Sequence, residues 1–309
     1  MPAVSVLVCT YRCGGLDLVL GSLAKQTFTD FEIVIVDDLA MERRAQILAI
    51  ARTLWGPEFA AKIIYPDHAP TRVAAASVAE NKAIVNASGE LCLWFCDYSW
   101  APFDWVENHW NTYLDSNKKA SAVGGSRFLN PPGVQEGLMR GAGPMGAPTG
   151  DLLHPHGDGS TPFTIFRESL EAGVAHLTPQ IGGQDPKLQL HDGPTADDFC
   201  VVHFKNEGVP LRVLLALNGV EAAYDAGHRH GDSDMFHRLI ESGWRFILNS
   251  KCHIDTVNVR FIMGTLPWPD SIEERQMALL RRKVVGYHRT KALRASGPDL
   301  QIEWDSLHG

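Results

Sequence analysis

The sequence lacks the features that mark membrane proteins and many nucleic-acid-binding proteins. No apolar run approaches the roughly 20 residues that a membrane-spanning helix needs, and Met1–Ala3 leads into a strand-like run rather than a signal peptide. Basic residues are outnumbered, with 28 Lys and Arg against 36 Asp and Glu in 309 residues and a net charge of −8. This balance gives no electrostatic reason to expect nucleic acid or an anionic membrane as a partner, but it leaves a local basic groove open. We expect a soluble, cytoplasmic protein.

The six cysteines also lack the spacing of a zinc site. Neither the Cys9–Cys13 pair nor the Cys92–Cys96 pair has the two-residue gap of a zinc knuckle. Three cysteines lie in or beside apolar strand-like runs, where a thiol packs as a small hydrophobic group. We therefore expect buried, reduced thiols.

Two apolar runs that end on carboxylates are the most informative feature of the chain. Leu91–Ser99 reads as a buried strand that reaches Asp97, and Val34–Val36 is followed by Asp37 and Asp38. Continuous apolar residues suit strands covered on both faces of a sheet. Open α/β sheets place their ligand crevice at the carboxyl ends of such strands. The two acidic strand ends indicate a nucleotide and metal site.

Residues 1–126 alternate between strand-like and helix-like patterns. Repeated β-α-β spacing of this kind predicts a mostly parallel, Rossmann-like sheet. The expected strands are Val4–Cys9, Phe31–Val36, Lys62–Tyr65, Leu91–Ser99 and Ala120–Gly124, and the expected helices are Leu16–Leu23, Met41–Leu54, Val73–Asn86 and Trp105–Leu114.

The pattern is lost between residues 130 and 198, which are rich in Gly, Pro, His and Asp. Loops of this length inside a compact protein are usually functional lids or disordered segments. Regular patterns then return, and an amphipathic, basic helix is expected near the C-terminus. The later expected elements are the strands Phe199–Phe204 and Trp244–Leu248 and the helices Pro210–Leu217, Asp234–Ser242 and Ile272–Arg289.

Two sets of segments look familiar. The first set lies in the opening of the chain and comprises Val4–Tyr11, Leu23–Thr27, Phe31–Asp38, Asn81–Ala83 and Ala87–Glu90, and the second comprises Leu217–Glu221 and Gly227–Leu239. The first set resembles glycosyltransferases of the family 2 type with a GT-A fold, and the second is similar to a block of galactosyltransferases and polypeptide GalNAc-transferases. Motifs in order over roughly residues 3–126 and 199–260 are more specific than any single motif.

The resemblance implies an α/β fold of the GT-A class, with a mostly parallel central sheet flanked by helices. It divides the chain into a nucleotide-sugar-binding half (1–126), an insertion or lid (127–198), an acceptor and catalytic half (199–260) and a C-terminal helix and tail (261–309). It implies a hexosyltransferase-like enzyme that moves a sugar from a UDP-sugar to a hydroxyl acceptor, assisted by Mn²⁺ or Mg²⁺, with inversion of configuration.

By this resemblance, Asp97-Tyr98-Ser99 occupies the metal-binding DxD position. A cation held there by oxygen ligands neutralises the anionic nucleoside diphosphate as the glycosidic bond breaks. Ser99 replaces the second acid as a predicted metal ligand, and a hydroxyl is a weaker ligand, so either Asp97 and a distant group hold the metal or the metal dependence is weak. His253 falls where family members often supply a histidine, which suits manganese-like ions. The alternative is a turn carboxylate at Asp97 and a structural histidine.

The resemblance also assigns the nucleotide contacts. Asp37 and Asp38, with Thr10 and Arg12, match the family's base and ribose contacts, and Asn81 is a further predicted nucleotide-binding residue. A carboxylate at a strand end can accept hydrogen bonds from ribose hydroxyls or from the uracil N–H. Capping of the following helix by Asp38 is the alternative, and it is compatible with ligand binding.

On the acceptor side, Asp232 aligns with the family's general base, although Gly231 replaces the usual Glu beside it. A positioned carboxylate takes the proton of the attacking sugar hydroxyl in inverting enzymes. The alternative is that Asp232 only caps the helix that follows. The predicted acceptor-binding residues are Trp100, Glu221 and Asp234.

Three other functions stay open at this point. A retaining glycosyltransferase could carry a similar block, and a sugar-nucleotide-binding protein without catalysis would explain Ser99 and Gly231. A nucleotidyltransferase is disfavoured because Thr10–Gly15 is a poor match to the Gly-rich, basic signature expected after its first strand. The residues leave the donor sugar, the acceptor and the oligomeric state undetermined.

Overall fold

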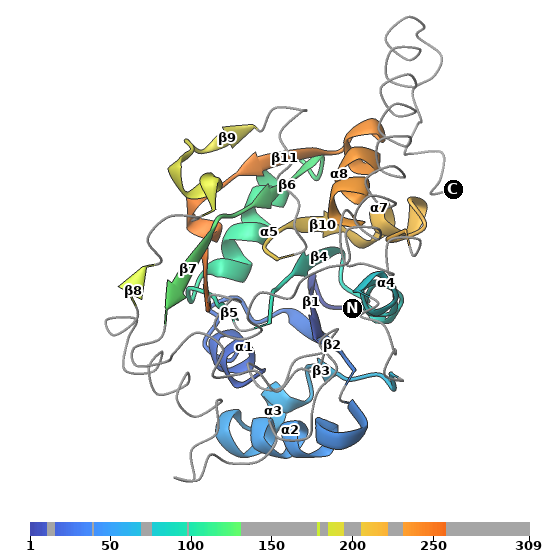
Figure 1. The fold of residues 1–309 in the computed structure, drawn as a ribbon, viewed down its shortest axis with the longest axis vertical. Coiled ribbons are helices and arrows are strands. Elements are labelled where there is room, and N and C mark those ends of the chain that lie inside the picture. The colour runs from blue at the N-terminus through green and yellow to red at the C-terminus, as the bar shows by residue number, and fades with distance from the viewer. Residues whose placement is uncertain are drawn as a thin grey trace, which may run out of the picture.

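The computed structural model of the chain is a mixed α/β structure (Figure 1). The structure describes residues 1–10, 16–38, 40–68, 76–97, 99–130, 178–179, 185–194, 205–221 and 231–257. None of the helices in these ranges is long and apolar enough to cross a membrane.

A central sheet has the strand order β10-β4-β1-β2-β3 in the described residues. Four of its strands run parallel, namely β1 (Val4–Thr10), β2 (Phe31–Asp37), β3 (Ile63–Ile64) and β4 (Leu91–Trp94), and β10 (Gly208–Pro210) is antiparallel to β4. All of β2 and β4, and all of β1 except Cys9, are buried. Strands covered on both faces need apolar side chains on both, which confirms the predicted parallel sheet.

Helices cover both faces of this sheet. The helices are α1 (Leu16–Leu23), α2 (Ala40–Trp55), α3 (Pro57–Ala60), α4 (Ala76–Asn86), α5 (Trp105–Asp115), α7 (Leu211–Ala216) and α8 (Gly231–Glu241). Figure 1 shows α4 and α7 on one side of the sheet and α1 and α5 on the other, while α2 and α3 lie beside β3.

Two smaller sheets follow the central one, with the strand orders β6-β11-β9 and β5-β12-β7-β8. Their strands are β5 (Ser99–Trp100), β6 (Ala120–Val123), β7 (Ser126–Asn130), β8 (Thr178–Pro179), β9 (Gly193–Pro194), β11 (Arg245–Leu248) and β12 (Ile254–Val257), and two 3-10 turns are η3 (Pro186–Gln189) and η5 (Ser250–Cys252). The chain passes from one small sheet to the other at Gly124 and Gly125. A β-carbon at Gly124 would lie 2.0 Å from the carbonyl oxygen of Cys252, so only glycine permits this approach.

The predicted strand Leu91–Ser99 is divided in the structure. β4 ends at Trp94, and the next residue still donates its amide N–H to the carbonyl of Leu7 at 2.9 Å. The chain then leaves the central sheet, and Ser99 pairs with Thr256 in another sheet. The residues next to this break, Leu93-Trp94 before it and Phe95-Cys96 after it, are all apolar, so local composition could not locate it.

Several other predicted elements lie outside the described residues. They are the strand Phe199–Phe204, the helix Ile272–Arg289 and most of the insertion at 127–198. The predicted helix Asp234–Ser242 is present but begins earlier, at Gly231.

Candidate functional site

The carboxyl ends of β1 and β4 bring two predicted site residues into contact. The hydroxyl of Thr10, the last residue of β1, donates to Oδ2 of Asp97 at 2.9 Å. Both side chains are nearly buried, with 4% and 3% of their surface exposed. Since β1 and β4 are parallel neighbours, their carboxyl ends share one edge of the sheet, the usual ligand-binding edge of this fold class.

Three acids surround the end of β1. Burial raises the pKa of the Cys9 thiol well above its ordinary value, and the nearby carboxylates of Glu80, Asp97 and Asp38 raise it further. Cys9 is therefore a neutral thiol at physiological pH rather than a nucleophilic thiolate. Three acids thus act on the end of β1 together.

Glu80, on α4, was missed by the sequence reasoning, although a signal for it exists. It precedes Ala83 and Ile84 by three and four residues, so it lies on the buried apolar face of the helix. Only 7% of Glu80 is exposed. An acid on the apolar stripe of a helix that packs near a ligand-binding edge is a candidate site residue.

Asp37 is held entirely by the protein. It is fully buried, and Arg43 donates Nε to Oδ2 and Nη2 to Oδ1, each at 2.7 Å. The hydroxyl of Tyr65 also donates to Oδ2. Burial, followed by the charge of Asp37, raises the pKa of Tyr65, so the phenol keeps its proton. This buried cluster stabilises the end of β2.

Asp38 follows directly and is placed differently. Its backbone N–H donates to the carbonyl of Thr10 at 3.0 Å, and its Oδ1 lies 2.8 Å from Nε2 of the buried His68. About an eighth of the Asp38 side chain is exposed, at 13%. Of the two consecutive acids, Asp38 is the one that reaches the surface beside Thr10.

Ser99 and Trp100 form β5, and both side chains contact other elements. The Ser99 hydroxyl is fully buried and lies 2.9 Å from the hydroxyl of Thr256. Lys25 places its ammonium group 5.0 Å from the centre of the Trp100 ring, and a methyl group at Gly21 would lie 3.6 Å from that ring. Trp100 therefore packs against α1, while Ser99 links β5 to β12.

The register of β5 and β12 places His253 away from Asp97. These strands are antiparallel, with Ser99 opposite Thr256 and Trp100 opposite Asp255. His253 precedes β12, so it lies at the Trp100 end of the pair, whereas Asp97 lies at the Ser99 end. The described residues hold no group of three or more His, Cys, Asp or Glu side chains that could bind a metal ion. This register gives no support to a shared metal shell for Asp97 and His253.

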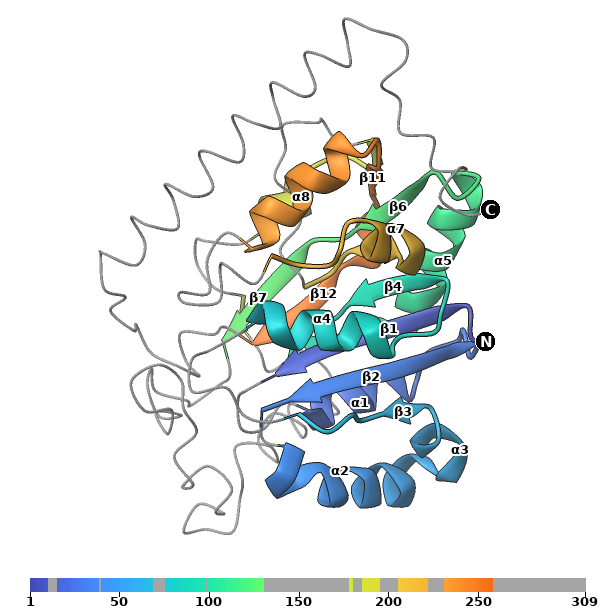
Figure 2. The ribbon, with the colours of Figure 1, turned by 90° about the vertical axis from the view of Figure 1, so that its right-hand side faces the viewer.

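The predicted general base lies in the first turn of α8. Asp232 is partly buried, and its Oδ1 accepts the backbone N–H of Ser233 at 2.7 Å. Asp234 is fully buried and forms an ion pair with Arg238 at 2.8 Å, so it anchors α8. Figure 2 shows the first turn of α8 on the side of the molecule where β1 and β2 end. The helix turn that carries Asp232 thus lies on the side of the molecule where the central parallel strands end.

Two further predicted residues have distinct settings. The side chain of Asn81, on α4, forms hydrogen bonds with both the backbone N–H and the carbonyl of Val220, at 2.7 and 2.8 Å. Glu221, which follows Val220, is partly buried. Arg12 lies outside the described residues.

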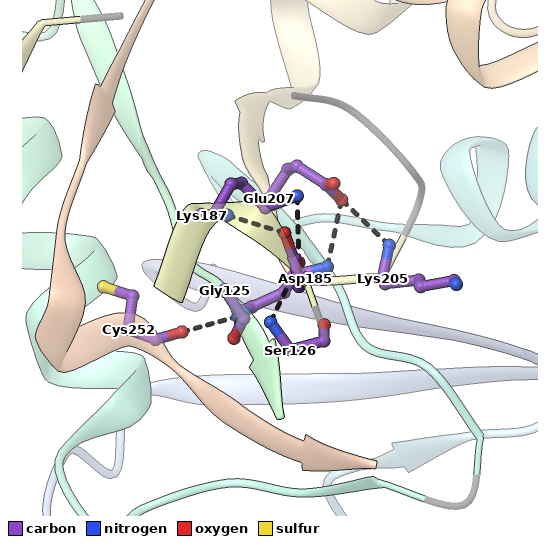
Figure 3. Close-up of polar contacts among 8 residues, drawn as sticks. Gly125, Ser126, Asp185, Lys187, Lys205, Glu207 and Cys252 are labelled. Atoms are coloured by element: carbon purple, nitrogen blue, oxygen red, sulfur yellow. Dashed lines mark hydrogen bonds and ion pairs between the residues drawn. The ribbon is translucent and has the colours of Figure 1, made fainter. Parts of the chain in front are cut away.

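Part of the predicted insertion is packed on the core (Figure 3). Asp185 is buried and accepts the backbone N–H of Ser126 and of Lys187, each at 3.0 Å, and its carboxylate lies 3.3 Å from the Lys187 ammonium. Asp192 accepts the N–H of Ser250 at 2.7 Å. Residues 185–194 therefore belong to the structural framework of the two small sheets.

No protein-family model matches the sequence, and no curated protein matches it. Among solved structures, the chain is similar to TarS of S. aureus, residues 1–349, at 13% identity and a TM-score of 0.51 over 82% of this chain and 60% of that one. The complex of that protein with UDP-GlcNAc gives 13% identity and a TM-score of 0.53 over 82% and 58% of the two chains. Its complex with UDP gives 13% identity and 0.52 over 82% and 60%.

The chain thus spans about 60% of the length of these structures. At this identity the similarity concerns the fold. It confirms the predicted α/β fold of the GT-A class, with its parallel central sheet and flanking helices.

Proposed function

We propose that the protein is a glycosyltransferase that moves a sugar from a UDP-sugar to a hydroxyl acceptor. The contact of Thr10 with Asp97 at the ligand-binding edge of a GT-A sheet carries this proposal, with Asp38 and Glu80 near the same strand end. The complexes of the structurally similar TarS with UDP-GlcNAc and with UDP support a UDP-sugar as the donor class.

In this proposal the nucleotide lies at the ends of β1 and β2. Asp38, oriented by His68, accepts hydrogen bonds from ribose hydroxyls or from the uracil N–H. Asp37, which precedes Asp38, is held by Arg43 and Tyr65 and so helps to fix the backbone position of Asp38. Thr10 and Arg12 complete the proposed set.

Asp97 is the proposed metal-binding carboxylate. Mg²⁺ usually keeps several waters and is bound by one or two carboxylates together with substrate phosphates. One nearly buried strand-end carboxylate among neighbouring acids fits such a shared site for Mn²⁺ or Mg²⁺. When bound, the cation would neutralise the charge of the leaving diphosphate. Ser99 supports the position of Asp97 through its bond to Thr256.

Asp232 is the proposed general base. It takes the proton of the acceptor hydroxyl as that oxygen bonds to the anomeric carbon, while the bond from this carbon to the diphosphate oxygen breaks and UDP leaves. Attack from the face opposite the leaving group inverts the configuration. Glu221 and Trp100 are proposed acceptor contacts, and Asp234 acts through the position of α8.

Thermal unfolding with UDP, with and without Mn²⁺, tests the donor site. Ligand at 100 times its dissociation constant should add about 2.7 kcal/mol to the free energy of unfolding. Asp97→Asn keeps an acceptor for Thr10 but removes the charge, so the Mn²⁺-dependent part of this gain should vanish. Asp115→Asn, at an exposed acid at the end of α5, should keep it. An unchanged Mn²⁺ effect in Asp97→Asn would refute the assignment.

A further inference from the structure

The turn Leu217–Glu221 has a defined conformation. Asn218 and Gly219 both have left-handed backbones, with φ of 60° and 65°, a region that glycine and asparagine tolerate best. The N–H of Gly219 donates to the carbonyl of Leu214 at 2.9 Å and so closes α7. The turn leads directly to Glu221 and onward toward α8.

From one side, α4 holds this turn through Asn81. The amide of Asn81 donates to the carbonyl of Val220 at 2.8 Å and accepts its N–H at 2.7 Å, across 139 positions of sequence. A β-carbon at Gly219 would lie 2.1 Å from Oδ1 of Asn81. The glycine therefore allows the asparagine to approach the backbone.

From the other side, α8 holds the same turn through Arg238. Its Nη1 donates to the carbonyls of Leu217 and Gly219, each at 2.8 Å. Its Nε donates to the fully buried carboxylate of Asp234, also at 2.8 Å, which orients the guanidinium group. Breaking either contact would leave backbone carbonyls of the turn without these partners, which is unfavourable for buried polar groups.

We propose that Asn81 and Arg238 are positioning residues that hold the first turn of α8, with Asp232, in register with the acidic edge of the sheet. Asn81 is adjacent to Glu80 on α4, which packs against β1, and the charge of Glu80 acts on Cys9 near the end of that strand. Arg238 lies two turns after Asp232 on α8. The backbone of the turn Leu217–Glu221 is thus bonded both by α4, on the donor side, and by α8, on the acceptor side. The inference rests on the proposed function, because it takes Asp232 as the base.

This arrangement assigns Asn81 to catalytic geometry rather than to nucleotide binding. A shift of about 1 Å in a reacting group can cost about 100-fold in rate, even when the change lies far from the chemistry. Loss of the Asn81 contact should therefore lower turnover while the nucleotide still binds. A nucleotide contact would have the opposite signature, since its loss weakens UDP binding.

The test compares Asn81→Ala with Asn86→Ala. Asn86 lies on the same helix and donates only to the carbonyl of Lys82, within α4, at 2.8 Å. The measurements are the dissociation constant of UDP with Mn²⁺ and the turnover of UDP-GlcNAc with water as the acceptor, counted per UDP-binding site. Arg238→Lys, which keeps the charge but loses the planar fork, is the second variant.

Asn81→Ala and Arg238→Lys should keep the UDP dissociation constant within about twofold and lower turnover by about 10- to 100-fold. Asn86→Ala should change neither. A higher dissociation constant in Asn81→Ala would make it a nucleotide contact and overturn the proposal. Normal turnover per binding site, with only a lower melting temperature, would show a purely structural contact and overturn it equally.

Amide hydrogen exchange separates this inference from the proposed function. Asn81→Ala should speed exchange in residues 217–221 and in the first turn of α8, because opening of one anchor loosens both. Asn86→Ala should not. If the wild-type protein turns over no UDP-sugar, the proposed function fails while the exchange data still judge the coupling. Unchanged exchange in α8 would overturn the coupling, whatever the activity.

Discussion

Most residues of β1, β2 and β4 are buried apolar side chains, whereas the bend between the two small sheets is held by polar side chains from distant parts of the chain. Asn206 is the centre of that bend. Its Nδ2 donates to the carbonyls of Gly125 and Cys252 at 3.1 and 2.6 Å, and its Oδ1 accepts the indole N–H of Trp105 at 2.8 Å.

The two regions should respond differently to substitution. Apolar packing is non-directional and tolerates exchanges that conserve volume. A buried hydrogen-bonding centre is directional, and each partner left unpaired costs about 1–3 kcal/mol. We therefore expect the central sheet to tolerate volume-conserving exchanges better than the polar bend does.

The largest effect is expected for a substitution of Asp232, which should separate turnover from UDP binding. Asp232→Asn removes the base but keeps the size and the bond to Ser233, so turnover of UDP-sugar should fall by about 10²- to 10⁴-fold. UDP binding, which we propose for the central sheet, should persist in calorimetric titration. Ser233→Ala serves as the neighbouring control. Retention of more than about a tenth of the activity would place the base elsewhere, with Glu221 next, or indicate a retaining reaction.

Alanine substitutions at two glycines should show how the bend and the surroundings of the central sheet differ in stability. Gly124→Ala puts a methyl group against the carbonyl of Cys252 and the amide of Asn206, and should lower the free energy of unfolding by about 3 kcal/mol. Gly21→Ala, in α1, meets only ordinary contacts at 3.5 and 3.6 Å and should raise it by about 0.5–1 kcal/mol. Denaturant unfolding measures both. Equal effects would contradict the contrast.

The buried His109 should make the polar region sensitive to acid. Burial lowers its pKa to about 4, and the hydrogen bond of Nε2 to Oδ1 of Asn206 offsets this only in part. Among the described residues Nδ1 has no hydrogen-bond partner. On acidification the unfolded imidazole, with a pKa of about 6.5, takes its proton first. The contribution is thus present above this value and lost as pH falls, by about 2 kcal/mol between pH 7 and 5.

Urea unfolding at the two pH values tests this contribution. His109→Gln should remove that part of the pH dependence, because it removes the titrating group. His191→Gln, at an exposed histidine, should leave the dependence unchanged. The same pH dependence in His109→Gln as in the wild type would disprove the assignment.

The smallest effect is expected at the surface. Lys118 and Glu90 form an ion pair at 2.7 Å whose side chains are 44% and 38% exposed. Exposed pairs of this kind contribute only about 0–1 kcal/mol, so Lys118→Ala should lower the free energy of unfolding by about 0.5 kcal/mol. If Lys118→Ala lowers the free energy of unfolding by more than about 2 kcal/mol, exposed polar contacts stabilise the protein as strongly as buried ones do.

The central sheet could be predicted because its signals are local. Apolar periodicity located β1, β2 and the helices between them, and the acids at the strand ends indicated the ligand-binding edge. The break after Trp94 could not be predicted, because both sides of it are apolar. The family resemblance predicts His253 as a metal ligand together with Asp97, whereas the register of β5 with β12 determines which residues of these strands meet.

The sequence by itself determined the fold class and the edge at which Thr10 and Asp97 meet. A run of apolar residues predicts a buried strand, and the acid that follows marks its end, so the whole signal lies within a few neighbouring residues. Only the tertiary structure decided that Asn81 holds Val220, that Trp100 packs on α1 and that Asp37 is enclosed by Arg43 and Tyr65. Each of these is a directional contact between distant segments. Its partner depends on strand register and helix orientation, which leave no local signal in the chain.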